Sequence, residues 1–195
     1  GEIMARTKKK KVYEIGELDQ YLFGQGTHYD LYKKMGSHLV VDGKKKGVYF
    51  AVWAPNAKAV SVVGDFNGWD RDKHPMEREE PLGIYTCFIK DMKEGELYKY
   101  CIETQKGELL YKADPFANYA EVRPGTASRV HDISGIKWTD SLWMEARKNW
   151  NIDESPMSIY EAHIGSWKQH PGEEEERFYN YREFAREAVK YMKEM

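Results

Sequence analysis

Short runs of β-branched and aromatic residues, separated by turn-forming residues, fill the middle of the chain and restrict most strongly what it can fold into. Residues 48–53 are the clearest run, and they stop at the turn-forming residues 54–56. Similar runs occupy residues 59–63, 84–89, 97–103, 109–111 and 128–131. Short strands at this spacing, broken by Gly, Pro and Asn, predict an immunoglobulin-like β-sandwich. Residues 91–96 are interpreted as a hairpin connection between two of these strands.

Helical patterns flank the predicted sandwich. Residues 16–23 and 30–35 are helical candidates, and Gly24 and Gly36 follow them where a C-cap is expected. After the sandwich, Thr139 and Asp140 can cap another helix. The fold predicted is therefore mainly β, with short helices ahead of the sandwich.

The last part of the chain predicts a strand followed by a helix. Residues 151–156 are interpreted as a linker, and residues 158–164 as a buried strand. Asn180 is a suitable N-cap, and Glu183 completes a capping box ahead of an apolar stripe. A strand–loop–helix unit leaves strand edges and a helical face uncovered. The sequence is thus expected to be cut off inside a second domain.

Charge and composition exclude several classes of function. The 30 basic and 32 acidic residues give a formal net charge of −2, without the basic excess of a nucleic-acid-binding protein. The sequence has no apolar span for a membrane and no signal peptide, so a cytoplasmic location is expected. The six histidines and two cysteines lack metal-ligand spacing, so neither a metal nor a cofactor is predicted.

The segment 64–70 is the first candidate for ligand binding. It follows a predicted strand and holds Trp69 in a turn, where an aromatic ring can face a sugar. Asn67 and Asp70 beside it can hydrogen-bond sugar hydroxyls. The alternative is that Asn67 and Gly68 only form the turn and that Trp69 packs back on the sandwich.

Two further positions are candidates. Lys99 lies between Tyr98 and Tyr100 on an alternating strand, so it faces away from both tyrosines and either reaches a ligand or remains a solvated lysine. Residues 160–167 place polar side chains in a buried strand that ends in Gly-Ser, as at the mouth of a barrel. The alternative for this segment is a core strand whose Glu and His are satisfied by neighbouring strands.

Four motifs together resemble one enzyme family. They are GDFNGWD, YKY, ADPFANYAEVRPGTASRV and IYEAHIGSW, and upstream DQYLFGQGTHYDLYKKMGSH fits as well. Over residues 18–195 the chain resembles the bacterial 1,4-α-glucan branching enzymes. FNGW alone is shared by many carbohydrate-binding modules of family 48, whereas the combination with YEAHIGSW is more specific to branching enzymes.

The resemblance implies a domain organisation. The family has an immunoglobulin-like module, a (β/α)8 barrel of glycoside hydrolase family 13 and a C-terminal β domain. In this chain it implies an N-terminal tail and short helical segment over residues 1–38 and a carbohydrate-binding module over 39–135. A helical linker over 136–157 and the first strand–helix unit of a truncated barrel over 158–195 complete the prediction.

The resemblance also implies an activity and a set of site residues. The family cleaves an α-1,4-glucan and transfers the piece to a 6-hydroxyl with retention, which uses two carboxyl groups. Those carboxyl groups lie on later barrel strands, so no catalytic residue is expected in this chain. Trp69 and Lys99 match glucan-binding positions of related modules, and Tyr160 matches a tyrosine that shapes the donor pocket. A second stacking tryptophan of related modules has no counterpart near Leu110 and Tyr111.

The expected partners are α-glucans such as glycogen, amylose and maltooligosaccharides, together with the remainder of the catalytic barrel. Neither nucleic acid nor a membrane is expected as a partner.

Two other functions stay open from the sequence. One is a stand-alone glycogen-binding or regulatory module, against which the barrel-like tail argues. The other is the front end of a different family-13 enzyme, such as a debranching enzyme.

Overall fold

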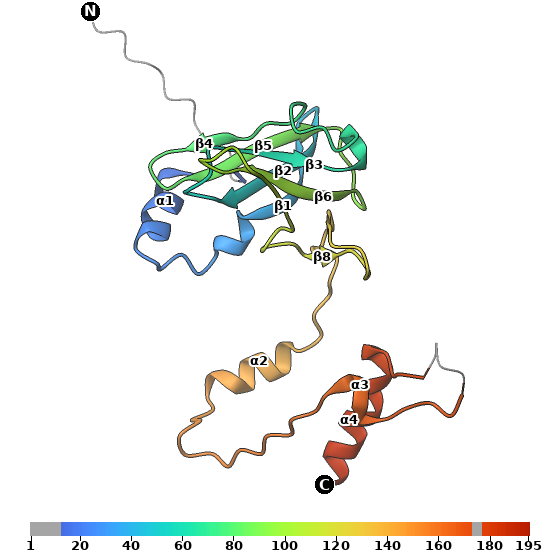
Figure 1. Ribbon diagram of the computed structural model, residues 1–195. Coiled ribbons are helices and arrows are strands. Elements are labelled where there is room, and N and C mark those ends of the chain that lie inside the picture. The colour runs from blue at the N-terminus through green and yellow to red at the C-terminus, as the bar shows by residue number, and fades with distance from the viewer. Residues whose placement is uncertain (1–12, 173–176) are drawn as a thin grey trace, which may run out of the picture. The chain divides into compact units, whose positions relative to one another are not determined.

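The computed structural model describes residues 13–172 and 177–195 (Figure 1). The chain divides into two compact units, residues 1–137 and residues 138–195, which we call the first and the second unit. Residues 1–12 of the predicted N-terminal tail lie outside the described part. Among the described residues, no helix has the length and apolarity needed to cross a membrane.

The first unit consists of two antiparallel sheets and a helical segment ahead of them. The helical elements are α1 (Glu17–Gly24), η1 (Leu31–Lys33) and η2 (Asp65–Asn67). The first sheet has the order β1-β2-β5-β4, with β1 (Gly36–Asp42), β2 (Lys45–Trp53), β5 (Ile84–Lys90) and β4 (Glu77–Glu79). The second sheet has the order β3-β6-β9-β8, and β7 also pairs with β6. Its strands are β3 (Ala59–Val63), β6 (Leu97–Glu103), β7 (Leu109–Lys112), β8 (Tyr119–Ala120) and β9 (Ser128–Arg129).

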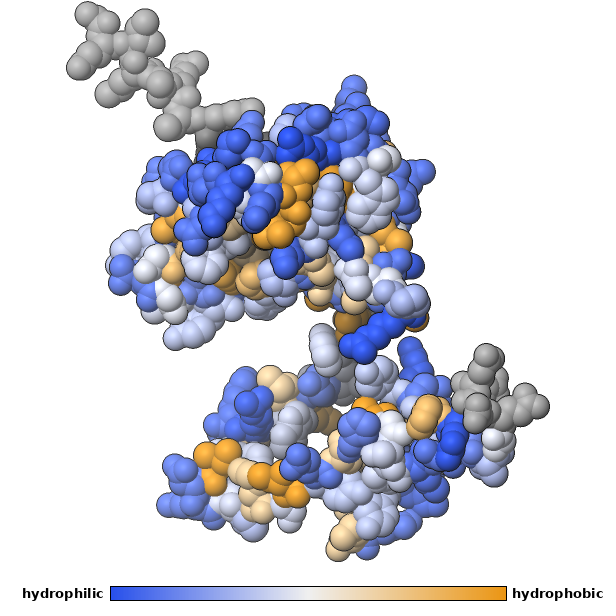
Figure 2. All heavy atoms as spheres, viewed as in Figure 1, coloured by the Kyte–Doolittle hydropathy of each residue, from blue (hydrophilic) through white to orange (hydrophobic). Residues whose placement is uncertain are grey.

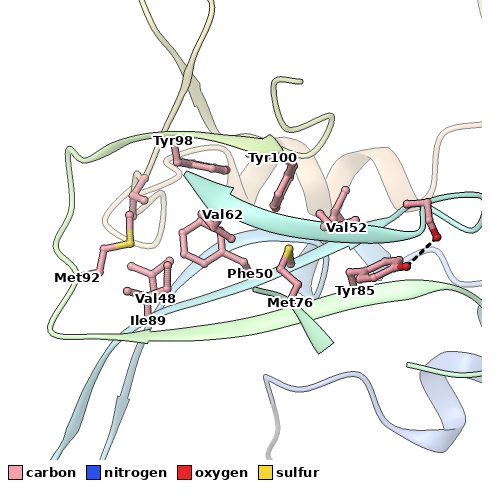
Figure 3. Close-up of a cluster of buried hydrophobic side chains, with 13 residues drawn as sticks. Val48, Phe50, Val52, Val62, Met76, Tyr85, Ile89, Met92, Tyr98 and Tyr100 are labelled. Carbon is pink, nitrogen blue, oxygen red and sulfur yellow. Dashed lines mark hydrogen bonds between the residues drawn. The ribbon is translucent and has the colours of Figure 1, made fainter. Parts of the chain in front are cut away.

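The main core lies between the two sheets. Side chains of alternate residues point to the same face of a strand, so Val48, Phe50 and Val52 of β2 enter the core together. Tyr98 and Tyr100 of β6 meet them from the second sheet, and the rings of Phe50 and Tyr98 are 4.9 Å apart in an edge-to-face arrangement (Figure 3). The predicted immunoglobulin-like sandwich is confirmed.

A second, smaller core covers the other face of the first sheet. Ile15 and Met35, from the segment ahead of the sandwich, pack with Tyr49 and Ala51 of β2. The segment is held by Asp19, which accepts from the Gly16 amide (2.8 Å) and pairs with His28 at 2.8 Å. The helices ahead of the sandwich therefore bury one face of the first sheet.

The hairpin predicted over residues 91–96 is wrong. Strands β5 and β6, which these residues join, belong to different sheets, so the connection crosses from one sheet to the other. Met92 within it is buried in the main core. Residues 91–96 have the length and turn residues of a hairpin, but only packing decides whether two strands pair side by side or face each other. Strand β1 was not predicted.

The second unit contains α2 (Ser141–Lys148), α3 (Ile164–Trp167) and α4 (Tyr181–Glu194). The predicted cap of α4 is confirmed: Asn180 accepts from the amide of Glu183 at 3.0 Å, and Glu183 accepts from the Asn180 amide at 2.9 Å. The apolar stripe of α4 lies partly on Trp167, whose ring is 5.3 Å from that of Phe184. Figure 2 shows hydrophobic side chains on the surface of this unit, and Trp138 and Ile159 are among the exposed ones.

The strand predicted over residues 158–164 is not present. Residues 158–163 have no regular secondary structure, and Ile164 begins the short helix α3. A strand is held by hydrogen bonds to neighbouring strands, and no strand pairs with this segment in the described part of the second unit. The assignment of residues 158–195 to a barrel stays a prediction.

A buried carboxyl group joins the second sheet to the segment that follows β7. Asp114 accepts hydrogen bonds from the hydroxyls of Tyr98 (2.6 Å) and Tyr100 (3.0 Å) and from the Phe116 amide (2.8 Å). Its own amide donates to Ser128 Oγ at 2.8 Å. Burial raises the pKa of Asp114, and the donors oppose this rise. The carboxyl group therefore satisfies three donors that would otherwise be buried without a partner.

Substitution of Asp114 tests this role. Asp114→Ala removes the acceptor of three buried donors, and we expect it to lower the free energy of unfolding by about 2–4 kcal/mol. Asp72→Ala is the matched control, because the Asp72 side chain is exposed, and we expect a change below about 0.5 kcal/mol. Urea unfolding followed by circular dichroism measures both. Equal stabilities of the two variants would contradict the assignment.

Candidate functional site

The turn after β3 holds Trp69 in an uncommon backbone conformation. Gly68 has φ 67°, and Trp69 itself has φ 60°, in the left-handed region. A bulky residue rarely adopts this conformation, and such strain costs on the order of 1–3 kcal/mol. The Trp69 amide donates to the Gly64 carbonyl at 2.9 Å, which closes the turn. Strained residues of this kind are concentrated at functional sites.

The Trp69 ring is held outside the sandwich core. Its indole N–H donates to Asp65 Oδ1 at 2.8 Å, and 38% of the residue is exposed. Trp69 is not part of either core cluster. Because the N–H is already bonded, the ring can meet a ligand through its exposed apolar surface. The alternative in which Trp69 packs back into the core does not describe this structure.

Asn67 has a structural role in the same turn. The residue is 3% exposed, its Oδ1 accepts from the Gly64 amide (3.1 Å), and its Nδ2 donates to the Val62 carbonyl (3.0 Å). The second hydrogen of Nδ2 points to His74 Nδ1 at 2.9 Å. Both groups of this buried amide therefore bond within the protein, and the contact of Asn67 with a sugar hydroxyl stays a prediction.

His74 supports the turn only in its neutral form. An amide N–H₂ group donates, so His74 Nδ1 must be unprotonated to accept from Asn67. The imidazole also lies 5.5 Å from the Phe66 ring. Burial, together with the nearby Lys73 ammonium, lowers the pKa of His74. His74 was not among the predicted site residues, since only the fold brings it next to Asn67.

Lys99 lies beside this turn on the outer face of the second sheet. It is directly opposite Val63, the residue that precedes the turn, in the β3–β6 pairing. Its neighbours Tyr98 and Tyr100 are in the core, so the predicted alternation is confirmed. Lys99 Nζ donates to Thr126 Oγ1 at 2.6 Å, which fixes the direction of the side chain. Thr126 comes from a distant segment and was not predicted.

Three more side chains from β6, β7 and the loop after Trp69 occupy the same outer face. Tyr111 is opposite Cys101, so it shares the face of Lys99, and 49% of it is exposed. Its hydroxyl interacts with the Cys101 thiol, which raises the pKa of Tyr111. Arg71 Nη1 donates to Glu103 Oε2 at 2.8 Å. We call Trp69, Lys99, Tyr111, Arg71 and Glu103 the aromatic face. Tyr111, Arg71 and Glu103 were missed from the sequence.

The other two predicted residues, Asp70 and Tyr160, form contacts of their own. Asp70 Oδ1 accepts from the Asp72 amide at 2.9 Å, and the residue is exposed next to Trp69 in the chain. Tyr160 belongs to the second unit, where its hydroxyl oxygen accepts from the Trp167 indole N–H at 2.7 Å. Across the described ranges, no three His, Cys, Asp or Glu side chains are grouped so that they could hold a metal ion.

Comparison with known proteins shows which family these residues match. Residues 34–117 match the family "Carbohydrate-binding module 48 (Isoamylase N-terminal domain)". The match includes the turn with Trp69, the strand with Lys99 and the buried Asp114. The first unit therefore matches a family of carbohydrate-binding modules over residues 34–117.

The relatives of the whole chain identify it further. The chain is 56% identical over 186 residues to the 1,4-alpha-glucan branching enzyme GlgB of Butyrivibrio fibrisolvens, covering 95% of this chain and 29% of that protein. It is 48% identical over 181 residues to the GlgB of Protochlamydia amoebophila (strain UWE25), covering 93% of this chain and 25% of that protein. The chain belongs to the family of the 1,4-α-glucan branching enzymes, as an N-terminal part that spans less than a third of these relatives.

A solved structure is also similar. It is the crystal structure of Klebsiella pneumoniae pullulanase complexed with maltotriose, which is 26% identical. The similarity covers 50% of this chain and 9% of the pullulanase, with a TM-score of 0.41.

The pairing of Asn67 with His74 predicts a pH-dependent stability. Folding lowers the pKa of His74 below its ordinary value of 6.5, so the unfolded chain binds the proton more readily. The contribution of His74 is therefore complete above pH 6.5 and is lost as the pH falls through and below that value. Thermal unfolding between pH 7.5 and 5 measures the effect, and in His74→Gln we expect a smaller decrease of Tm than in the wild type. An identical decrease in both proteins would contradict this role of His74.

Proposed function

We propose that this chain is the glucan-binding N-terminal portion of a 1,4-α-glucan branching enzyme. The full-length protein would cleave an α-1,4-glucan and transfer the piece to a 6-hydroxyl, forming an α-1,6 branch by a retaining double displacement. The observation that carries the proposal is that the chain is 56% identical over 186 residues to a branching enzyme and holds Trp69 at the surface of the module.

The aromatic face has the chemistry that a pyranose ring requires. One side of a glucose ring exposes C–H groups and can stack on the flat surface of Trp69, while its hydroxyls need donors and acceptors. Lys99 supplies a donor next to the turn, and the Arg71–Glu103 pair supplies donors and acceptors along the same strand. Tyr111 offers a second exposed ring on the same face. A linear α-glucan such as amylose or a maltooligosaccharide is the proposed ligand.

Tyr160 has a separate proposed role. Its counterpart in the family shapes the donor pocket of the barrel, and we propose the same for Tyr160 within the full-length enzyme. Its hydroxyl is already held by the Trp167 indole, which would fix the ring for such a role. The remainder of the barrel is the proposed partner of the second unit. Cytoplasmic location, which the sequence predicts, stays a prediction.

The contribution of Trp69 can be separated from its effect on folding. Trp69→Ala removes the stacking ring, and we expect a loss of about 1–2 kcal/mol of binding, or roughly 5- to 30-fold weaker retention on a glycogen affinity gel. Trp69→Gly should lose retention equally and remain at least as stable as Trp69→Ala, because glycine adopts a positive φ without strain.

One control variant and two contrary results complete the test of Trp69. Trp150→Ala is the matched control, because Trp150 is similarly exposed but lies in the second unit, and its retention should equal that of the wild type. Folded Trp69 variants with wild-type retention would exclude stacking by Trp69. Equal losses in the Trp69 and Trp150 variants would place the glucan contact elsewhere.

The branching activity itself is tested on two proteins. We expect the full-length gene product to increase α-1,6 linkages in amylose, measured by the fall in iodine staining and by debranching analysis. The 195-residue chain should give no increase, because in this family the two carboxyl groups lie on later barrel strands. Branching by the 195-residue chain alone, or hydrolysis without transfer by the full-length protein, would refute this assignment.

A further inference from the structure

Gly64 connects the Trp69 ring to a series of buried hydrogen bonds. Its carbonyl accepts from the Trp69 amide at 2.9 Å, and its own amide donates to Asn67 Oδ1 at 3.1 Å. Trp69 has φ 60°, and a bulky residue keeps this conformation only where the surrounding contacts hold it. The position of the exposed ring therefore depends on the buried Asn67 side chain, through Gly64.

The Asn67 amide has one favourable orientation in this turn. Its Nδ2 donates one hydrogen to the Val62 carbonyl at 3.0 Å and directs the other to His74 Nδ1 at 2.9 Å. Rotation of the amide by 180° would place its N–H₂ group against the Gly64 N–H and its oxygen against the Val62 oxygen. Because Asn67 is 3% exposed, each bond lost in this way would be costly. His74 must therefore accept from Asn67, which only its neutral form can do.

Protonation of His74 opposes this arrangement. A proton on Nδ1 would face the Asn67 N–H₂ group, so two donors would meet and one of the side chains would have to move. Lys73 Nζ donates to the Asn67 carbonyl at 3.1 Å, which holds a positive charge at the turn. Burial, followed by this ammonium group, lowers the pKa of His74. The turn is therefore built for neutral His74 and is disturbed by the imidazolium.

The charged groups around the turn leave His74 as the group to follow between pH 7.5 and pH 5. Hydrogen bonds from Lys58 and Arg71 lower the pKa of Glu103, so this side chain stays a carboxylate over that range. Asp65 accepts from the indole N–H at 2.8 Å. The chosen range lies above the one in which carboxyl groups ordinarily titrate, whereas imidazole groups ordinarily titrate within it.

We propose that His74 is a positioning residue of the glucan site, and that its protonation loosens the turn and weakens glucan binding. This role rests on the proposed function, because it requires that Trp69 stacks on the glucan. Neutral His74 holds Asn67, Gly64 and the ring in place for the ligand, and acidification releases them. Linkage is reciprocal, so a bound glucan must in turn favour the neutral form of His74.

The affinity of the 195-residue chain for maltoheptaose, measured at pH 7.5 and at pH 5, tests the proposal. A nuclear magnetic resonance titration follows the indole N–H signal of Trp69. We expect binding to be roughly threefold weaker at pH 5, where only part of the molecules carry the proton on His74. Circular dichroism at both pH values confirms that the protein is folded.

A second histidine provides the matched control. His28 pairs with Asp19 in the segment ahead of the sandwich, which covers the first sheet, whereas the turn with Trp69 follows a strand of the second sheet. His28→Gln should therefore bind maltoheptaose as the wild type does at pH 7.5 and show the same loss at pH 5.

Two substitutions of His74 separate the acceptor from the proton. His74→Ala removes the acceptor for Asn67, and we expect weak binding at both pH values. The side-chain oxygen of asparagine is as many bonds from Cα as Nδ1 is, and it accepts without being protonated in this range. His74→Asn should therefore bind more tightly than His74→Ala at pH 7.5 and should lose the dependence on pH.

The wild-type chain gives a test that needs no altered protein for its result. The ring proton signals of His74, assigned by their absence from the spectrum of His74→Asn, report its protonation. We expect saturating maltoheptaose to move the midpoint of this titration to lower pH, by an amount that matches the loss of affinity. A histidine that only supports the fold would keep its midpoint when glucan binds.

Three results would overturn the proposal. These are equal wild-type affinity at pH 7.5 and pH 5, a His74 midpoint that maltoheptaose leaves unchanged, and a full loss of affinity at pH 5 in His74→Asn. Each of them leaves binding at pH 7.5, and with it the proposed function, intact. Absence of maltoheptaose binding by the wild-type chain at pH 7.5 would instead refute the glucan site and this role of His74 together.

Discussion

Much of the first unit depends on the alternation of side chains along strand β6. Tyr98 and Tyr100 enter the core, and their hydroxyls are satisfied by the buried carboxyl group of Asp114. The same alternation directs Lys99 to the outer face, where Thr126 accepts its hydrogen bond. The segment from Asp114 to Ser128 is held at both ends by these contacts. One strand therefore links the stability of the sandwich to the geometry of the aromatic face.

The turn after β3 shows how polar groups inside the protein support an exposed aromatic ring. The buried Asn67 side chain forms hydrogen bonds to Gly64, Val62 and His74, while Asp65 accepts from the indole N–H of Trp69. These contacts offset the strain of a tryptophan in the left-handed region. A ring held in this way loses little conformational freedom when a ligand stacks on it, which favours binding by a small site.

The two units differ in how much of their apolar surface is covered. The first unit has a main core between its sheets and a smaller one under the helical segment. In the second unit, Ala188 is the one buried residue within the three helices, and several tryptophans and tyrosines are exposed. Apolar surface exposed to this extent is typical of an interaction site. The curated relatives are more than three times as long as this chain, and the assignment of this unit to a barrel stays a prediction.

Local patterns in the sequence were sufficient for part of this description. The period of two in residues 97–103 predicted both the strand and the outward direction of Lys99, and Asn180 with Glu183 predicted the start of α4, because these features depend on nearest neighbours along the chain. The resemblance carried by GDFNGWD and IYEAHIGSW identified the family.

Tertiary structure decided the contacts that depend on residues far apart in the sequence. The Val62 carbonyl and His74 give the Asn67 amide partners within the protein. The packing of the two sheets decided that residues 91–96 do not form a hairpin. The predicted strand over residues 158–164 requires strands that pair with it, which no local pattern can supply. Tyr111, Arg71 and Glu103 joined Trp69 and Lys99 only through strand register and a loop contact. Sequence by itself determined the family and those elements whose signals are local, such as β6 and the start of α4, because neighbouring residues specify them. Long-range packing determined how the strands pair and which side chains remain exposed.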